Sequence, residues 1–115
     1  FSGSNMEVII NLGVPTTFSK IQTTFFQYYL SWIILPTSVS YAISDDGKNF
    51  TELDNLTHKT PLMQEGKFKH SFSFEKENTK AKYLKVIAKT VGKLPKEHPA
   101  AGSDAWIFID EIVIE

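Results

Sequence analysis

The sequence predicts an all-β protein, built as an antiparallel β-sandwich or jelly roll. Short runs of alternating or β-branched apolar residues recur along the chain, and turn residues bound each run. Amphipathic helical spacing is hard to find. Of the 115 residues, 42% are hydrophobic and 22% charged, which is typical of a soluble globular protein. Residues 1–115 are therefore expected to form a single domain.

Two of the expected strands form a hairpin. In the run 39–43, Val39, Tyr41 and Ile43 alternate with smaller residues, and Asp46 and Gly47 follow in the turn. Aspartate favours the start of such turns and glycine accepts positive φ angles, so the chain should return as a strand. The complete set of expected strands is 6–12, 20–26, 39–43, 50–56, 67–74, 83–91 and 106–114.

Three segments are expected to connect strands. Residues 13–19 contain a proline and predict a short turn, and residues 27–35 form an aromatic-rich connection. Residues 92–104 contain two prolines and two glycines and predict a long loop, a feature that is often functional. The last strand, 106–114, is almost wholly apolar and is expected to lie buried in the centre of a sheet.

Composition excludes several kinds of function. The chain has no cysteine, which excludes disulfides, thiolate metal sites and a cysteine nucleophile. All 12 basic residues are lysines and the net charge is −1, so nucleic acid is not an expected partner. The longest apolar run, 30–36, is too short to span a membrane. The sequence begins with neither a signal peptide nor an initiator methionine, which suggests that it is a piece of a longer protein.

No residues predict catalysis. Asp110 and Glu111 are adjacent, and successive side chains of a strand face opposite sides, so the two carboxylates should not flank one bond. The three histidines, His58, His70 and His98, are scattered without the paired spacing of a zinc site. His70 is expected to be a packed or rim histidine. No nucleophile elbow or phosphate loop occurs. We expect no enzyme activity from this chain alone.

Four motifs occur in the order that is typical of one family. They are IINLG at 9–13, VSYAISDDGKNF at 39–50, AKYLKV at 81–86 and FIDEIVI at 108–114. Together they resemble the discoidin-like, or coagulation factor 5/8 type C, domains, which implies a galactose-binding-domain-like β-sandwich. Segments 31–36 and 92–111 resemble the discoidin-like domain at the C-terminal end of Bacteroides-type family 20 β-N-acetylhexosaminidases, or chitobiases.

The resemblance also implies what this chain lacks. Complete discoidin-like domains have about 150 residues, and their opening segment, which supplies an edge of the sandwich and most of a calcium loop, is not found here. Glu111 matches the family's glutamate that helps to hold structural calcium, a hard cation that prefers oxygen ligands. Without the opening loop we expect no cofactor and a structural carboxylate at Glu111; calcium is expected only in the complete domain.

Related sugar-binding modules place their sites on loops at one end of the sandwich. Aromatic rings stack on the C–H faces of sugars, and polar groups fix the hydroxyls. For Trp32 the alternative is packing in the core or on a neighbouring domain, and for Trp106 core packing is expected. Adjacent tyrosines should split inward and outward, and the loop histidine could simply brace its loop. The candidate sugar-binding residues are Gln27, Tyr28, Tyr29, Trp32 and His98.

Two hypotheses for the function follow. The first is an ancillary carbohydrate-binding module that holds a secreted, periplasmic or cell-surface bacterial hexosaminidase near N-acetylglucosamine- or galactose-containing glycans. The second is a structural domain that packs on the catalytic domain and stabilises it, without a sugar site. The resemblance implies a glycan or the parent's catalytic domain as partner.

Overall fold

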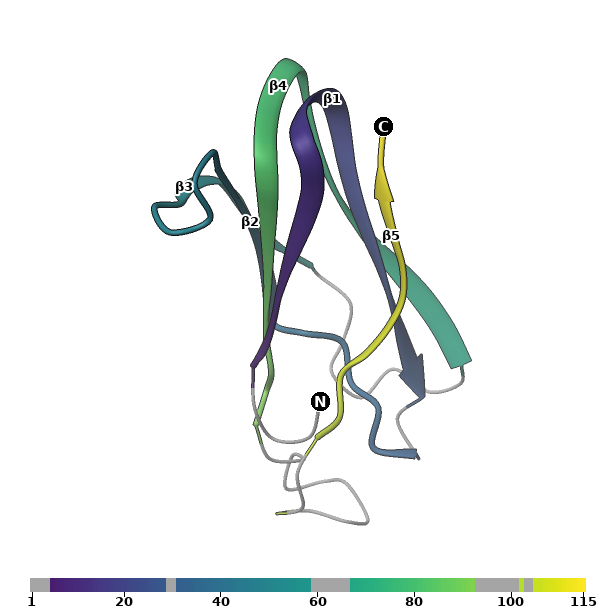
Figure 1. Cartoon of the computed structure of the whole chain (residues 1–115). Coiled ribbons are helices and arrows are strands. Elements are labelled where there is room, and N and C mark those ends of the chain that lie inside the picture. Colours follow the sequence, from purple (N-terminus) through teal and green to yellow (C-terminus); the bar gives the residue numbers. More distant parts are fainter. Residues whose placement is uncertain (1–4, 29–30, 59–66, 93–101, 103–104) are drawn as a thin grey trace.

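The computed structural model describes residues 5–28, 31–58, 67–92, 102 and 105–115. They form one five-stranded sheet in the order β3-β2-β4-β1-β5, and all neighbouring strands are antiparallel (Figure 1). Within these residues there is no α-helix, and hence none that could cross a membrane. The strands are β1 (Met6–Tyr28), β2 (Ser38–Ser44), β3 (Thr51–Thr57), β4 (Lys67–Lys89) and β5 (Phe108–Ile114).

The sheet folds over on itself because its two longest strands bend. The first part of β1 pairs with the last part of β4, from Met6↔Ala88 onward, and this layer also contains β2 and β3. The last part of β1 pairs with the first part of β4, ending at Tyr28↔Lys67, and this layer also contains β5. Figure 1 shows both long strands curving over at one end of the molecule. The predicted β-sandwich is confirmed, with pairs of the expected strands merged into β1 and β4.

The expected turn at residues 13–19 is wrong, because this segment belongs to β1. Gly13 takes a φ of 87°, and the ladder with β4 shifts register between Asn11 and Thr16 and again between Phe18 and Lys20. Register shifts bend a strand without ending its pairing. The proline is therefore accommodated inside a bend of the strand.

The expected buried central strand at 106–114 is also wrong. β5 begins at Phe108 and lies at the edge of the sheet order, and among the described strands its partner is β1. The segment is apolar on both faces: Ile107 is buried, whereas Phe108 is 52% exposed. An apolar run alone cannot distinguish a central strand from an edge strand whose outer face is uncovered.

Tyr41 joins the two layers. This β2 residue is fully buried, and its hydroxyl donates a hydrogen bond to the carbonyl oxygen of Phe72 on β4 at 2.8 Å. The hydroxyl of Thr23 on β1 lies 2.7 Å from the hydroxyl oxygen of Tyr41 and can donate a hydrogen bond to it. Burial raises the pKa of Tyr41. Buried side chains from both layers surround this contact, among them Met6, Ile21, Phe25, Val39, Leu84 and Val86.

The predicted hairpin is confirmed between β2 and β3. Gly47 has a φ of 77°, and the Asp46 carboxylate accepts hydrogen bonds from the backbone N–H groups of Lys48 and Asn49 at 2.8 and 2.9 Å. These bonds, with those from Ser44 and the Asn49 side chain, hold the pKa of Asp46 well below its usual range. Turn chemistry thus fixes the register of β3 on β2.

Candidate functional site

Three segments run side by side beyond the end of β1. Tyr28 and Ile33 form an antiparallel bridge, with N–H···O distances of 3.0 and 3.2 Å. On its other side Ile33 forms a parallel bridge with Trp106. In this second bridge the Trp106 N–H donates to the Trp32 carbonyl at 2.8 Å, and the Ile34 N–H donates to the Trp106 carbonyl at 3.0 Å. Backbone hydrogen bonds therefore fix residues that are distant in the sequence.

The bridges place several of these side chains on one face. Directly paired residues project to the same side, and side chains alternate along a strand. Trp106 lies between the buried Ala105 and Ile107, so it projects outward and is 47% exposed. The residues that follow on this face form the edge-to-face ring pair Phe26–Phe108, with centroids 6.0 Å apart. We call Phe26, Tyr28, Ile33, Trp106 and Phe108 the outer aromatic face.

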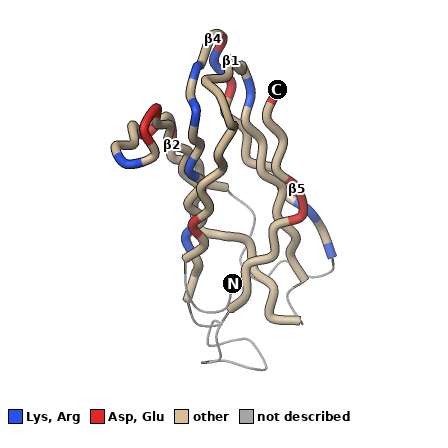
Figure 2. The backbone as a smooth tube through the Cα atoms, viewed as in Figure 1, with Lys and Arg blue, Asp and Glu red and all other residues tan. Residues whose placement is uncertain are grey.

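Lysines and carboxylates border the outer aromatic face. Lys67 pairs with Tyr28 across the strands, and its Nζ lies 4.9 Å from the centroid of the tyrosine ring. Lys69 lies opposite Phe26 and forms a 3.1 Å ion pair with Asp110 of β5. No charged residue occurs in the sequence between positions 20 and 45, and the described segments that carry the two tryptophans contain no charge (Figure 2). The five side chains of the face are uncharged, and the Lys67 ammonium lies over one of its rings.

Trp32 is held in an unusual backbone conformation next to this face. Its φ of 67° lies in the left-handed region, which bulky residues rarely adopt. In an extended strand its side chain would alternate with that of Ile33 and share the interior with the buried Ile34. The left-handed backbone breaks this alternation, and the side chain is 39% exposed. The sequence alternative of core packing is therefore wrong for Trp32.

Gln27 supports the same segment from inside. Its side chain is 1% exposed, and its Oε1 accepts a 3.0 Å hydrogen bond from the backbone N–H of Leu35. Gln27 shares the inner face of β1 with Phe25, since side chains alternate along the strand. Gln27 therefore positions the segment 31–35. Its buried side chain does not contact a ligand on the surface.

The structure brings together some of the predicted site residues. Tyr28 and Trp32 both lie at the end of the sandwich that carries the outer aromatic face, which we call the aromatic end. The side chain of Gln27 is buried there, on the inner face of β1. Tyr29 and His98 lie outside the described residues. Trp106 was expected in the core, and this expectation is wrong because the smaller neighbours on either side of it occupy the interior. Sequence reasoning missed Trp106 and Phe108 as surface residues, although their shared parity was a signal for a common face.

The two adjacent carboxylates of β5 do not follow the expected alternation. The ladder with β1 shifts register between Ile109 and Glu111, and both Asp110 and Glu111 are exposed. Asp110 is engaged by Lys69, and Glu111 lies opposite Thr24. Among the residues that the structure describes, no three histidine, aspartate or glutamate side chains are grouped as metal ligands. The role of Glu111, as a structural carboxylate or as a calcium ligand of the complete domain, stays a prediction.

Two histidines that lie apart in the sequence are in contact in the structure. The rings of His58, just after β3, and His70 on β4 have centroids 5.6 Å apart. Phe72 packs edge-on against the His70 ring at 4.9 Å. Desolvation, and secondly the nearby His58, lower the pKa of His70. His70 is half-buried in this aromatic contact, as the packed or rim interpretation predicted.

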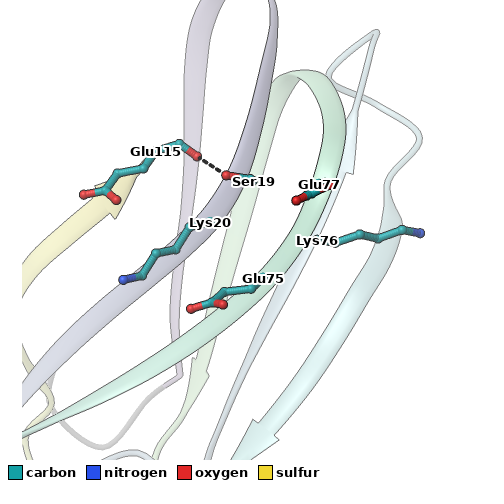
Figure 3. A pocket seen from close by; sticks show the side chains of 6 residues that line it. All are labelled: Ser19, Lys20, Glu75, Lys76, Glu77 and Glu115. Carbon is teal, nitrogen blue, oxygen red and sulfur yellow. Dashed lines mark hydrogen bonds between the residues drawn. The ribbon is translucent and has the colours of Figure 1, made fainter.

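An open pocket of about 370 Å³ lies at the opposite end of the molecule (Figure 3). The end of the chain reaches this pocket, where the carbonyl of Glu115 accepts hydrogen bonds from the backbone N–H groups of Ser19 and Lys20 at 2.7 and 3.0 Å. Lys76 points away from Lys20 in Figure 3. No aromatic ring lines this pocket, so it offers hydrogen bonds without a stacking surface. Its lining consists of Ser19, Lys20, Glu75, Lys76, Glu77 and Glu115.

Fold and sequence comparisons agree on the class of this protein. Two antiparallel layers that share bent strands, without a helix among the described residues, form a discoidin-like β-sandwich. The sequence matches the F5/8 type C domain family over residues 2–111, and the chain belongs to that family. A search of curated proteins found no significant match.

Two solved structures illustrate the similarity. One is the C-terminal domain of a chitobiase from Bacteroides fragilis, with 16% identity over 96% of this chain and 65% of that one, and a TM-score of 0.46. The other is CpGH89CBM32-5 from Clostridium perfringens, in complex with GalNAc-β-1,3-galactose, with 18% identity over 91% of this chain and 65% of that one, and a TM-score of 0.51. The chain thus spans about two thirds of the length of each.

Proposed function

We propose that this domain is a non-catalytic carbohydrate-binding module that holds a parent glycosidase near its glycans. Its ligands are glycans with terminal N-acetylglucosamine or galactose-type sugars. The site is the aromatic end of the sandwich, where Tyr28 and Trp32 contact the sugar and Gln27 positions their segment. Tyr29 and His98 complete the site as the sequence predicts. The observation that carries this proposal is the exposed Trp32 ring in its fixed left-handed conformation.

Physical reasons connect Trp32 with a ligand. A left-handed conformation at a bulky residue costs about 1–3 kcal/mol and persists where the surroundings enforce it, often at binding sites. Here the enforcement comes from the hydrogen bond between the Trp32 carbonyl and the Trp106 N–H, and from the Gln27 contact with Leu35. A ring that is fixed before binding loses little conformational entropy when a sugar stacks on it.

The similar structures support the ligand class. CpGH89CBM32-5 binds GalNAc-β-1,3-galactose, and a chitobiase is the parent of the Bacteroides fragilis domain. We extend this to the present chain as part of the proposal: the parent is a β-N-acetylhexosaminidase that acts outside the bacterial cytoplasm. Binding to single sugars should be weak, because a shallow site buries few sugar atoms.

The test is an NMR titration of the isotope-labelled chain with N-acetylglucosamine, galactose and N-acetylgalactosamine. The proposal predicts saturable shifts centred on Tyr28 and Trp32, at millimolar sugar. Trp32→Ala should abolish these shifts, whereas Trp32→Phe should retain part of the affinity, since a smaller ring still stacks. Val14→Ala is the matched control, because Val14 is 66% exposed and far along β1 from the site. Flat titrations with all three sugars contradict the proposal.

A second candidate function has an observation of its own. Trp106 and Phe108 expose large apolar rings on the edge strand segment, as a surface that packs on another domain would. In this case the domain stabilises the catalytic domain and binds no sugar. Removing residues 1–115 from the parent enzyme should then lower its thermal stability markedly. An unchanged melting temperature of the shortened parent contradicts this alternative.

A further inference from the structure

We infer that His58 and His70 together bind a divalent transition-metal ion, for which Zn²⁺ is the probe. His58 follows the last residue of β3 in one layer of the sandwich, and His70 lies on the first part of β4 in the other layer. The bound ion joins the two layers and stabilises the domain. The inference goes beyond the proposed function, because it assigns a second ligand to residues outside the proposed sugar site.

The separation of the two rings suits one shared ion. The ring centroids of His58 and His70 are 5.6 Å apart, and the ring planes are tilted by 53°. Imidazole nitrogens bind zinc at about 2.0–2.1 Å, so two imidazoles on one four-coordinate ion have ring centres roughly 5–6 Å apart. Each ring can turn about its metal–nitrogen bond, which makes this tilt compatible with coordination. The rings therefore already lie at the separation that shared coordination requires.

Phe72 holds both imidazoles from beneath. Its ring packs edge-on against His70, with centroids 4.9 Å apart, and against His58, with centroids 5.9 Å apart. The Phe72 side chain is 2% exposed, and its carbonyl accepts the buried hydrogen bond from Tyr41 at 2.8 Å. The two ligands thus share an apolar, firmly packed support, as the shell around a metal site often provides. Ligands that are placed before binding lose little conformational entropy when the ion binds.

The protonation state of the pair favours metal binding. An imidazole must be neutral to bind a metal ion. Desolvation, and secondly the nearby His58, lower the pKa of His70, so its ring is neutral at neutral pH. Both histidines are half-buried, which leaves water access to the ion. The surroundings that disfavour a charged His70 therefore favour the form that acts as a ligand.

The ligand set selects the class of ion. Imidazole suits zinc, copper and nickel, whereas calcium and magnesium prefer carboxylate and carbonyl oxygens. Among the described residues no third histidine, aspartate or glutamate joins the pair as a ligand. Water therefore completes the coordination shell. Two protein ligands predict an exchangeable ion, in contrast to structural zinc sites, in which four protein ligands close the shell.

The first test is the melting temperature of the chain with and without Zn²⁺. Zn²⁺ at about 0.5 mM should raise the melting temperature by about 5 °C, because an ion that binds only the folded chain stabilises it. His58→Asn and His70→Asn should each lose most of this rise, measured against the metal-free melting temperature of the same variant. Mg²⁺ should cause no rise. His98→Asn removes the third histidine of the sequence and is the matched control, which should keep the zinc response.

A second measurement on the wild-type chain needs no variant. Cu²⁺ is paramagnetic and broadens the NMR resonances of nuclei close to it. At substoichiometric Cu²⁺, broadening should be strongest for the side chains of His58, His70 and Phe72. Resonances of the residues around the charged pocket, among them Glu75 and Glu77, should broaden less, because carboxylates bind copper less well than paired imidazoles.

Each outcome supports or overturns the metal site. An unchanged melting temperature with Zn²⁺ overturns the inference. A rise that persists in His58→Asn and His70→Asn, or that is lost in His98→Asn, shows that other groups bind the ion and also overturns it. If either variant does not fold, the copper map of the wild-type chain decides, and broadening centred away from His58 and His70 contradicts the site. None of these results depends on sugar binding, so failure of the metal site leaves the proposed function standing.

Discussion

The two ends of the sandwich differ in what they offer a ligand. At one end Trp32 and Trp106 expose their rings beside the partly buried Tyr28, and backbone hydrogen bonds hold the three segments together. At the other end the bend of β1 and β4 forms an open pocket whose lining is polar and charged. The pocket is the more concave feature, but sugars require apolar stacking surfaces as well as hydrogen bonds. Chemistry rather than concavity therefore selects the aromatic end.

The largest effect is expected from a substitution at the aromatic end, and matched substitutions at the charged end should have almost none. Trp32→Ala should cost more than tenfold in sugar affinity, whereas Lys20→Ala and Glu75→Gln should change it by less than twofold. Calorimetric titration with N-acetylglucosamine oligomers measures both. Equal losses of sugar affinity from substitutions at the two ends would contradict the assignment of the sugar site to the aromatic end.

Gln27→Ala tests whether the aromatic end depends on a buried hydrogen bond. The variant leaves the buried N–H of Leu35 without the Gln27 acceptor, which costs about 1–3 kcal/mol of unfolding free energy. Sugar affinity should fall although Gln27 does not contact the ligand. Urea denaturation and titration of the same variant check this. A loss of affinity at unchanged stability would instead indicate direct contact between Gln27 and the sugar.

Tyr41→Phe should lower the stability of the whole sandwich, because Tyr41 joins the two layers. Removing the hydroxyl leaves the buried Phe72 carbonyl without this donor and should lower the free energy of unfolding by about 1–3 kcal/mol. Combination with Thr23→Val should be less than additive, since the two hydroxyls share one hydrogen bond. Sugar affinity of the folded variant should remain. Full additivity in the double variant would argue against this shared contact.

The smallest effect is expected from the histidine pair. The pKa of His70 is lower in the folded than in the unfolded chain, first because of desolvation and then because of His58. The unfolded chain therefore binds more protons as the pH falls, so stability is full above about pH 6.5 and decreases below it. His70→Asn should flatten the dependence of the melting temperature on pH between about 5 and 7. If the melting temperature of this variant depends on pH as steeply as that of the wild type, groups other than His70 cause the dependence.

Local patterns were enough to predict much of the fold. The hairpin at Asp46 and Gly47 follows from turn chemistry within a few residues, and the alternation of β4 follows from its phenylalanines. The bend at Gly13 could not be distinguished from a turn, because whether a ladder resumes after a bend depends on the partner strand. The expected strands merge because β1 and β4 continue to pair after the bend, and this depends on tertiary structure.

The candidate site was predicted less completely, for definite reasons. Residues 105–108 are apolar at every position, so no polar residue shows which side faces solvent; the structure places Ala105 and Ile107 inside and the larger rings outside. The approach of His58 to His70 depends on the packing of two layers, which no local spacing reports. The burial of Gln27, in contrast, follows from its parity with Phe25 and was available from the sequence.

The most direct test of the central claim is tryptophan fluorescence during a sugar titration. The chain contains two tryptophans, Trp32 and Trp106, and both lie at the aromatic end, so their emission reports on that end. The account predicts a saturable change of emission and reduced quenching by acrylamide as N-acetylglucosamine oligomers bind, and Trp106→Phe should keep the response of Trp32. Binding detected by calorimetry with unchanged tryptophan emission would contradict the account and place the site elsewhere.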